Sequence, residues 1–479
     1  MYNRQFQSQF QKRLRLKSVY PAIGMILAAH LAACSSSDST TMLGATTSSG
    51  LETKFERESY GAKKIDLQPT NLSFAGAVIA DEPTAALIAR TTLEKGGNAA
   101  DAATALYFAL SVTYPAAAGL GGGGACLVRD AETGDVSSVS FLTRKPMSGG
   151  AFGVPGNVRG FAIIQARFGS KPWAQLVSPA ERLAATGMQT SRATARQLST
   201  SQNLTRQFTK ADGSNYGEAE PLRQIELAST LARIRARGVV GFYQGDTAHL
   251  LVAASDDMGG GLTSSDLSQY LPGIVDAPKK TIGELDVSLL DAATKSGAFS
   301  ENLWADVQNA STASAVEAAG NAAAASVGES ANGEDMGATS FVTIDGKGGA
   351  VACSLTMNGS FGTGKAATGT GVVFAPAASS ASAFLTPVIV DQANAKDGLY
   401  VAAAGAGAPK AGASALAVVA AALSGQKGAG DRALAASPAN ATSPANAIVC
   451  SEGLPRGTCR LSLSPDSAGV GLSAVSTGS

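Results

Sequence analysis

The stretch 337–364, GATSFVTIDGKGGAVACSLTMNGSFGTG, decides the fold of this chain. Residues 340–345 are rich in β-branched and aromatic side chains, and they predict a strand. Residues 345–349, Asp-Gly-Lys-Gly-Gly, predict a turn, and residues 350–357 predict a second strand. The two strands therefore form a hairpin with a longer loop.

The segment that leads into this hairpin, residues 310–335, consists mostly of Ala, Ser, Gly, Asn and Glu. This composition predicts a mobile linker or a weak helix. A strand that begins abruptly after such a segment, with a hydroxyl residue at its start, suits a self-cleaving enzyme. The cut exposes a new N-terminal Thr or Ser, and the freed amine then acts as the base for its own hydroxyl.

The composition limits the classes of function. The chain has 479 residues, enough for one large domain or for two to three ordinary ones. Lys plus Arg and Asp plus Glu both number 37, and no basic block stands out after the N-terminal segment, so no nucleic-acid partner is expected. His30 and His249 are the two histidines, which argues against a His-based triad or a His-rich metal site.

The N-terminus reads as an export signal. A short apolar run, residues 22–33, follows five basic residues and ends in Leu-Ala-Ala before Cys34. This order resembles a bacterial lipoprotein box, so Cys34 is predicted to carry lipid. The chain is then an exported lipoprotein of the bacterial cell envelope, at the outer membrane facing the periplasm, and it reaches the membrane only through that anchor. An ordinary secretory signal with an incidental Cys is the alternative. We assign residues 1–34 to the signal peptide and residues 35–74 to a Ser/Thr-rich tether.

The other four cysteines separate into two pairs. Cys450 and Cys459 flank a short loop and are candidates for a disulfide, which export permits. Cys126 and Cys353 lie in apolar strands and are predicted to be small buried side chains. No cysteine spacing suggests zinc, and neither a metal nor a cofactor is predicted.

A second informative block precedes the hairpin. Residues 76–80 predict a strand, residues 85–94 a helix, and residues 99–112 a buried, alanine-rich helix. The glycines of 119–124 follow, and then the strand 125–128. No Lys-Ser/Thr pair follows the glycines, so close packing of helix on sheet explains them better than a phosphate loop does.

Together these blocks resemble the gamma-glutamyltransferases (gamma-glutamyltranspeptidases, glutathione hydrolases), a family of N-terminal-nucleophile hydrolases. The matching motifs are Gly-Gly-Asn-Ala-Ala-Asp-Ala-Ala at 96–103 and Gly-Leu-Gly-Gly-Gly at 119–123. Thr-Met-Asn at 356–358 and Phe-Gly-Thr-Gly at 361–364 continue the match.

The resemblance implies an α/β fold, a four-layer α/β/β/α sandwich of the N-terminal-nucleophile type. Residues 75–336 then form a large-subunit-like part, and residues 337–423 form a small-subunit-like part of the same domain. Residues 424–479 are rich in Ala, Ser, Gly and Pro and predict a loosely ordered, low-complexity C-terminal tail.

The resemblance also implies an activity. The family hydrolyses or transfers a gamma-glutamyl group from glutathione-like amides through a Thr nucleophile freed by autocleavage, so the expected substrate is a small gamma-glutamyl compound or a related acyl amide. The alignment places the family's nucleophile at Ala338, which has no hydroxyl.

Three interpretations follow from this substitution. In the first, the cleaved bond is shifted by one residue and Thr339 is the nucleophile. Strand alternation opposes this shift, because it turns the side chain to the other face, but a bulge at the start of the strand would permit it. Alternatively, the chain is an unprocessed, inactive relative that binds a ligand or partner in the envelope. In the third, residue 338 is changed in an otherwise active enzyme.

Further site residues are carried over by the same resemblance. Thr356 corresponds to the Thr that bonds the nucleophile, and Asn358 to a residue that holds the substrate. Leu142 stands where the family has a carboxylate-binding Arg, and Arg144, two residues on, is the candidate replacement.

The family's substrate-holding turn is only partly retained around residues 405–407. Gly405 and Gly407 match the family's Gly-Gly turn, which helps to hold the substrate and its oxyanion. Ala383 and Phe384 stand where the family has two Ser. A polymer hydrolase with paired carboxylates, Asp256-Asp257, is a poorer alternative, because solvated charge explains that pair.

Overall fold

The computed structural model describes residues 72–201, 206–308, 310, 312–330, 337–393, 398–424, 445–454, 458–463 and 467–477. The predicted signal peptide, Cys34 and the tether up to residue 71 lie outside these residues. The first strand begins at Leu72, slightly earlier than the sequence suggests.

One antiparallel sheet carries the hairpin quoted above. Strands β9 and β10 are its centre, and β9 is paired on its other side with β1. The strand order is β17-β1-β9-β10-β2-β3-β6. The bounds are β1 Leu72–Ala80, β2 Gly123–Arg129, β3 Val136–Ser140, β6 Gly273–Asp276, β9 Ala338–Asp345, β10 Ala350–Thr356 and β17 Val470–Thr477.

A second antiparallel sheet packs against the first. Its strand order is β16-β15-β14-β13-β8-β7. Apolar side chains of β9 and β10 meet those of β13, β14 and β15 in one buried cluster between the two sheets. The bounds are β7 Lys279–Ile282, β8 Leu285–Ser288, β13 Thr386–Gln392, β14 Leu399–Gly405, β15 Asn446–Leu454 and β16 Cys459–Leu463.

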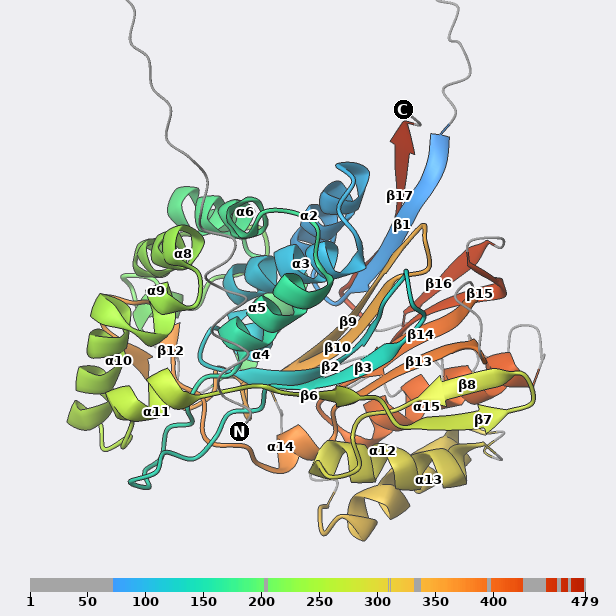
Figure 1. The fold of residues 1–479 in the computed structure, drawn as a ribbon. Coiled ribbons are helices and arrows are strands. Elements are labelled where there is room, and N and C mark those ends of the chain that lie inside the picture. Colours follow the sequence, from blue (N-terminus) through green and yellow to red (C-terminus); the bar gives the residue numbers. More distant parts are fainter. Residues whose placement is uncertain are drawn as a thin grey trace, which may run out of the picture. The chain divides into compact units, whose positions relative to one another are not determined.

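Helices cover the outer face of each sheet (Figure 1). The first sheet is covered chiefly by α2 Pro83–Glu94, α3 Ala99–Thr113 and α5 Asn157–Phe168; α6 Trp173–Thr186 packs on α3, and α8 Ile225–Arg237 packs on α6. The second is covered by α12 Lys295–Val307 and α15 Pro409–Leu423, and α13 Ala313–Ser326 packs on these two helices. This arrangement confirms the predicted four-layer α/β/β/α sandwich. The smaller elements are α4 Pro115–Ala118, β4 Met188–Gln189, α7 Arg192–Thr200, η1 Arg206–Phe208, β5 Pro221–Leu222, α9 Val240–Tyr243, α10 Gly245–Asp257, α11 Ser264–Gln269, β11 Ala366–Ala367, β12 Val372–Val373 and α14 Ser380–Ala383.

Helix α3 forms the centre of the helical layer over the first sheet. Asn98 caps its N-terminus by accepting a hydrogen bond from the Asp101 backbone, and the Asp101 carboxylate accepts one from the Asn98 backbone. Every residue of α3 is buried. Its many alanines let the helix lie close to the sheet, as the sequence predicted.

The prediction of a loosely ordered tail is wrong for the described residues after 445. Strand β15 pairs with β14 in the second sheet, and β17 pairs with β1 in the first. These strands could not be predicted from composition, because they are rich in small residues. Ala, Ser and Gly are as common in strands that pack closely between layers as they are in loops. The segment 425–444 lies outside the described residues.

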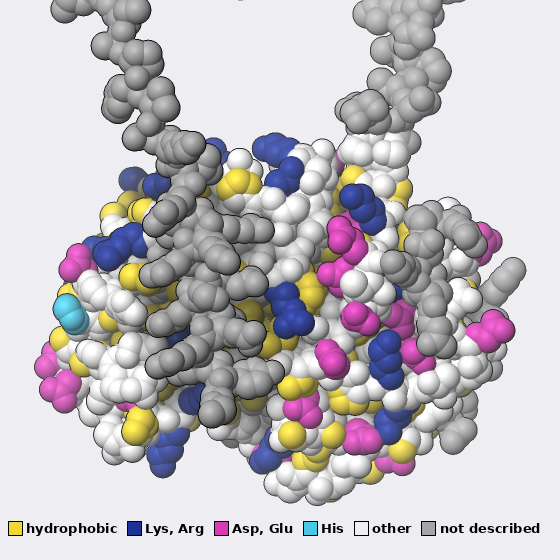
Figure 2. Space-filling view, in the orientation of Figure 1, with side chains coloured by type: hydrophobic (Ala, Val, Ile, Leu, Met, Phe, Trp, Pro, Cys, Tyr) yellow, Lys and Arg dark blue, Asp and Glu magenta, His cyan; other side chains and the backbone are white. Residues whose placement is uncertain are grey.

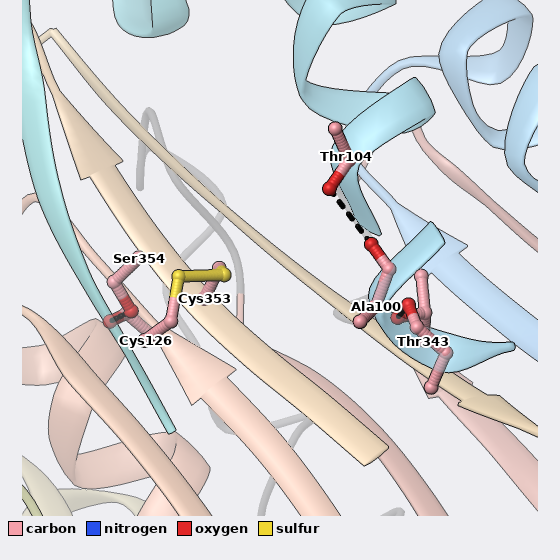
Figure 3. The surroundings of a disulfide bond; sticks show 8 residues. Ala100, Thr104, Cys126, Thr343, Cys353 and Ser354 are labelled. Carbon is pink, nitrogen blue, oxygen red and sulfur yellow. Dashed lines mark hydrogen bonds between the residues drawn. A yellow bond between two sulfur atoms is a disulfide. The ribbon is translucent and has the colours of Figure 1, made fainter. Parts of the chain in front are cut away.

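Both cysteine pairs are disulfides. The predicted Cys450–Cys459 bond is confirmed, and it joins the paired strands β15 and β16. Cys126 and Cys353, predicted to be small buried side chains, are buried but bonded to each other. They stand directly opposite on β2 and β10, a long-range pairing that sequence spacing does not reveal (Figure 3).

The surface drawn in Figure 2 mixes Lys and Arg with Asp and Glu, and its described part shows no broad area of one sign. This agrees with the formal charge of zero.

Candidate active site

The start of β9 is the centre of the candidate site. Ala338 lies opposite Thr356 of β10. The Thr356 hydroxyl donates a hydrogen bond to the carbonyl of Gly337 (3.2 Å) and accepts one from the Asn358 backbone (2.8 Å). Thr356 therefore holds the backbone immediately before Ala338, whereas the resemblance implied a bond to the nucleophile itself.

Gly337 is required by the backbone at this point. Its φ is 50°, and a Cβ there would lie 2.0 Å from the carbonyl oxygen of Gly359. A side chain is therefore excluded both by conformation and by space.

Asn358 ties three neighbouring segments together. Its amide nitrogen donates to Thr143 Oγ1 (2.9 Å) and to the Pro376 carbonyl (3.1 Å). Its amide oxygen accepts from Ser382 Oγ (2.7 Å). The side chain is engaged within the protein, so in this state it holds the loop after β10.

The surroundings of Ala338 are apolar. Ala338 is 3% exposed and belongs to the cluster between the two sheets, together with Leu385 and Ala406. Leu142 packs against that cluster in the place expected for an Arg. Phe384, in place of an expected Ser, is fully buried in a separate cluster between the second sheet and its helices.

Thr339 points to the opposite face of β9, where it meets a buried carboxylate. Its Oγ1 donates to Asp81 Oδ2 (2.6 Å), and the Ser340 backbone donates to the same oxygen (3.2 Å). Asn446 Nδ2 donates to Asp81 Oδ1 (2.9 Å). Thr339 and Asp81 are 0% and 4% exposed.

Asp81 is a polar residue that sequence reasoning missed. Burial raises the pKa of its carboxyl from 3.8 to about 6, although the three hydrogen bonds act to lower it. The available signal was a carboxylate directly after the apolar strand at 76–80. Its partners, Thr339 and Asn446, are distant in sequence, so their proximity was not visible.

Arg144 is engaged with Tyr270 and Leu271 rather than with the start of β9. Its guanidinium sits over the Tyr270 ring, 4.9 Å from the ring centroid, and donates to the Leu271 carbonyl (2.7 Å). The side chain is exposed. Its neighbour Thr143 is the residue that contacts Asn358.

Gly405 and Gly407 form the junction between β14 and α15. A Cβ on Gly405 would lie 2.3 Å from the Ala411 carbonyl oxygen, and Gly407 has a φ of 93°. The Gly405 carbonyl accepts a hydrogen bond from Ser354 of β10 (2.9 Å), which joins the two sheets near the candidate site.

Within the described part of the chain, no three His, Cys, Asp or Glu side chains are grouped to hold a metal ion. The helices described there are all too short or too polar to cross a membrane.

Comparisons with known proteins agree with this geometry. Residues 85–304 match the profile of the family described as gamma-glutamyltranspeptidase. The glutathione hydrolase proenzyme of Bacillus subtilis is 33% identical over 222 residues, which is 41% of this chain and 38% of that protein. The proenzyme of Escherichia coli is 30% identical over 240 residues, 44% of this chain and 41% of that protein. The match thus spans about two-fifths of these relatives.

A solved structure shares the fold over a longer stretch. The cephalosporin acylase from Bacillus halodurans superposes with a TM-score of 0.67 at 17% identity. The superposition covers 89% of this chain and 100% of that one. In sequence, residues 85–304 of this chain are therefore similar to the gamma-glutamyltranspeptidase family.

Proposed function

We propose that this chain is a self-processing acyl-amide hydrolase or transferase of the gamma-glutamyl type, with Thr339 as its nucleophile. The observation that carries the proposal is the 2.6 Å hydrogen bond from the Thr339 hydroxyl to the buried Asp81 carboxylate at the start of β9. A hydroxyl becomes a useful nucleophile when a base lies within hydrogen-bond reach.

The chemistry has two stages. A cut between Ala338 and Thr339 frees the amine of Thr339 next to its own hydroxyl. The hydroxyl then attacks the carbonyl of a substrate amide, and the acyl group passes from Thr339 to water or to an amino acid. Thr356 holds the backbone of β10 beside this strand start throughout.

Glutathione-like amides are the first substrates to try, because the curated relatives are named glutathione hydrolases. The apolar residues Leu142, Ala383 and Phe384 stand where the family places polar groups for a glutamyl donor. These substitutions remove polar groups that hold a glutamyl donor in the family, so anilides of less polar acids are tested beside the glutamyl compounds.

A second candidate is an uncut, non-catalytic relative that acts as a lipid-anchored binding protein of the envelope. The presence of Ala338, buried among apolar side chains, favours it. Both candidates share the proposed location, an exported lipoprotein anchored through Cys34 at the outer membrane. The two disulfides support an oxidising compartment.

Acyl release from a panel of amides tests the enzyme proposal. The panel pairs gamma-glutamyl anilide and glutathione with anilides of less polar acids. Thr339→Val is compared with Thr343→Val, which removes a buried hydroxyl from the same strand and face. We expect Thr339→Val to abolish release and Thr343→Val to retain it. Equal release by both variants, or none by the wild-type chain, contradicts the proposal.

A further inference from the structure

A buried carboxylate is built into the junction of the two sheets beside Thr339. Asp81 follows β1, Thr339 and Ser340 belong to β9, and Asn446 belongs to β15 of the second sheet. Both oxygens of Asp81 are fixed: Oδ1 by Asn446, and Oδ2 by the Thr339 hydroxyl and the Ser340 backbone.

We propose that Asp81 is the general base that takes the Thr339 hydroxyl proton during self-cleavage of the bond between Ala338 and Thr339. This inference rests on the proposed function, and it assigns the proton transfer to a residue outside the sequence motifs.

The surroundings of Asp81 suit a base. Its three hydrogen-bond partners are a hydroxyl, a backbone N–H and a side-chain amide, none of which carries a charge to neutralise it. The neighbouring Glu82 points its carboxylate at the Ala85 backbone and caps α2. Burial raises the pKa of Asp81 to about 6, so the ionised carboxylate binds a proton more tightly than an exposed one.

The geometry of the chain suits the attack itself. The Thr339 hydroxyl oxygen and the carbonyl carbon of Ala338 are joined through the nitrogen, Cα and Cβ of Thr339, so the attack closes a five-membered ring. The hydroxyl already donates to Asp81 Oδ2 at 2.6 Å, so the carboxylate is in place to accept the proton.

The O–H bond of Thr339 breaks, its proton passes to Asp81 Oδ2, and the oxygen bonds to the Ala338 carbonyl carbon. The C–N bond then breaks as the Thr339 nitrogen takes that proton back, which leaves an ester between the two residues. Water hydrolyses the ester to give a carboxylate on Ala338 and a free amine and hydroxyl on Thr339.

The rate of self-cleavage against pH tests the assignment. The full chain is synthesised by cell-free translation. The appearance of its two fragments is then followed over time at several pH values between pH 5 and pH 8. We expect the wild-type rate to rise roughly tenfold from pH 5 to pH 7 and then level off, as a base with a pKa near 6 ionises. Asp81→Asn is expected to slow the cut by at least ~100-fold.

Asp345→Asn is the matched control, because Asp345 is a buried carboxylate at the other end of β9. It is expected to cleave at the wild-type rate. Thermal unfolding of each variant shows whether it has folded. If Asp81→Asn fails to fold, the test is the dependence of the wild-type cleavage rate on pH. A rate that does not change from pH 5 to pH 7 overturns the assignment.

The two proposals fail differently. A wild-type chain that remains uncut at every pH overturns both. A wild-type chain cut before Thr339, with Asp81→Asn cut equally fast and with the same pH profile, overturns only the role of Asp81.

Discussion

Ala338 and Thr339 are adjacent in β9, and their side chains lie on opposite faces of the first sheet. Ala338 packs between the two sheets, whereas Thr339 bonds Asp81 on the face that also carries Phe341 and Thr343. Strand alternation produces this separation, since successive side chains point to opposite faces. A hydroxyl displaced by one residue therefore meets different neighbours and needs a different base.

Restoring the hydroxyl at the family's position should move the cut. In Ala338→Thr, we expect cleavage before position 338, while Leu142 and Phe384 still disfavour a glutamyl donor. Ala338 is 3% exposed, so the larger side chain costs about 1–3 kcal/mol of stability. N-terminal sequencing of the smaller fragment checks the prediction. A fragment that still begins at Thr339 would show that position 338 does not control the site.

Asp81 should make the protein less stable as the pH rises. Its pKa of about 6 in the folded state exceeds the 3.8 expected when unfolded, so stability is full below pH 3.8 and is lost as the pH rises through 6. Between pH 4 and pH 8, the free energy of unfolding should fall by about 2 kcal/mol relative to an Asp81→Asn variant.

Urea unfolding measures this difference. Both proteins carry Thr339→Val, which prevents the cut and removes one hydrogen bond that lowers the pKa of Asp81. If the difference in unfolding free energy between the two proteins does not change with pH, then burial does not raise the pKa of Asp81.

The Cys126–Cys353 disulfide should hold the two pieces of a cut chain together. A break before Thr339 leaves Cys126 in the larger piece and Cys353 in the smaller one. We expect one band without reductant and two bands with it on a denaturing gel. Two bands without reductant would show that this bond does not form.

The same disulfide should stabilise the fold more than Cys450–Cys459 does. The bonded residues are 227 apart in sequence in Cys126–Cys353 and 9 apart in Cys450–Cys459. A disulfide that closes a longer loop removes more entropy from the unfolded chain. Replacing Cys126 and Cys353 by Ala should cost about 2–4 kcal/mol in urea unfolding. The corresponding change at Cys450 and Cys459 is the control, and an equal or larger loss there contradicts the prediction.

Gly337 should tolerate no side chain. Gly337→Ala forces a Cβ against the Gly359 carbonyl at 2.0 Å, and it also strains a φ of 50°. Gly283→Ala is the matched control, because its φ of 62° is similar and a Cβ there meets nothing within 4 Å. We expect Gly337→Ala to lose at least ~2 kcal/mol and Gly283→Ala about 1 kcal/mol. Equal losses in thermal unfolding would mean that the backbone strain, not the close contact, matters.

The fold was predictable because its strongest signals are local or shared with a known family. The Asn98–Asp101 cap, the alanine-rich α3 and the β9–β10 hairpin follow from the order of their residues. Strands β15 and β17 were missed, because each is specified by a partner strand far away rather than by its own small residues.

The candidate site was predictable only along β9 and β10. Thr356 lies opposite Ala338, and the Asn358 backbone bonds Thr356, while their roles in binding and catalysis stay predictions. Asp81 was invisible because its contact with Thr339 joins residues 258 apart. The Cys126–Cys353 bond was missed for the same reason.

The intact mass of the purified mature protein after reduction, with N-terminal sequencing of any smaller piece, is the most direct test of Thr339 as nucleophile. Reduction is essential, because the disulfide between Cys126 and Cys353 would otherwise mask a cut. The account predicts two pieces, the smaller beginning at Thr339. A smaller piece that begins at Ala338 would indicate cleavage by another protease, and a single uncut chain would contradict the enzyme and favour the binding protein.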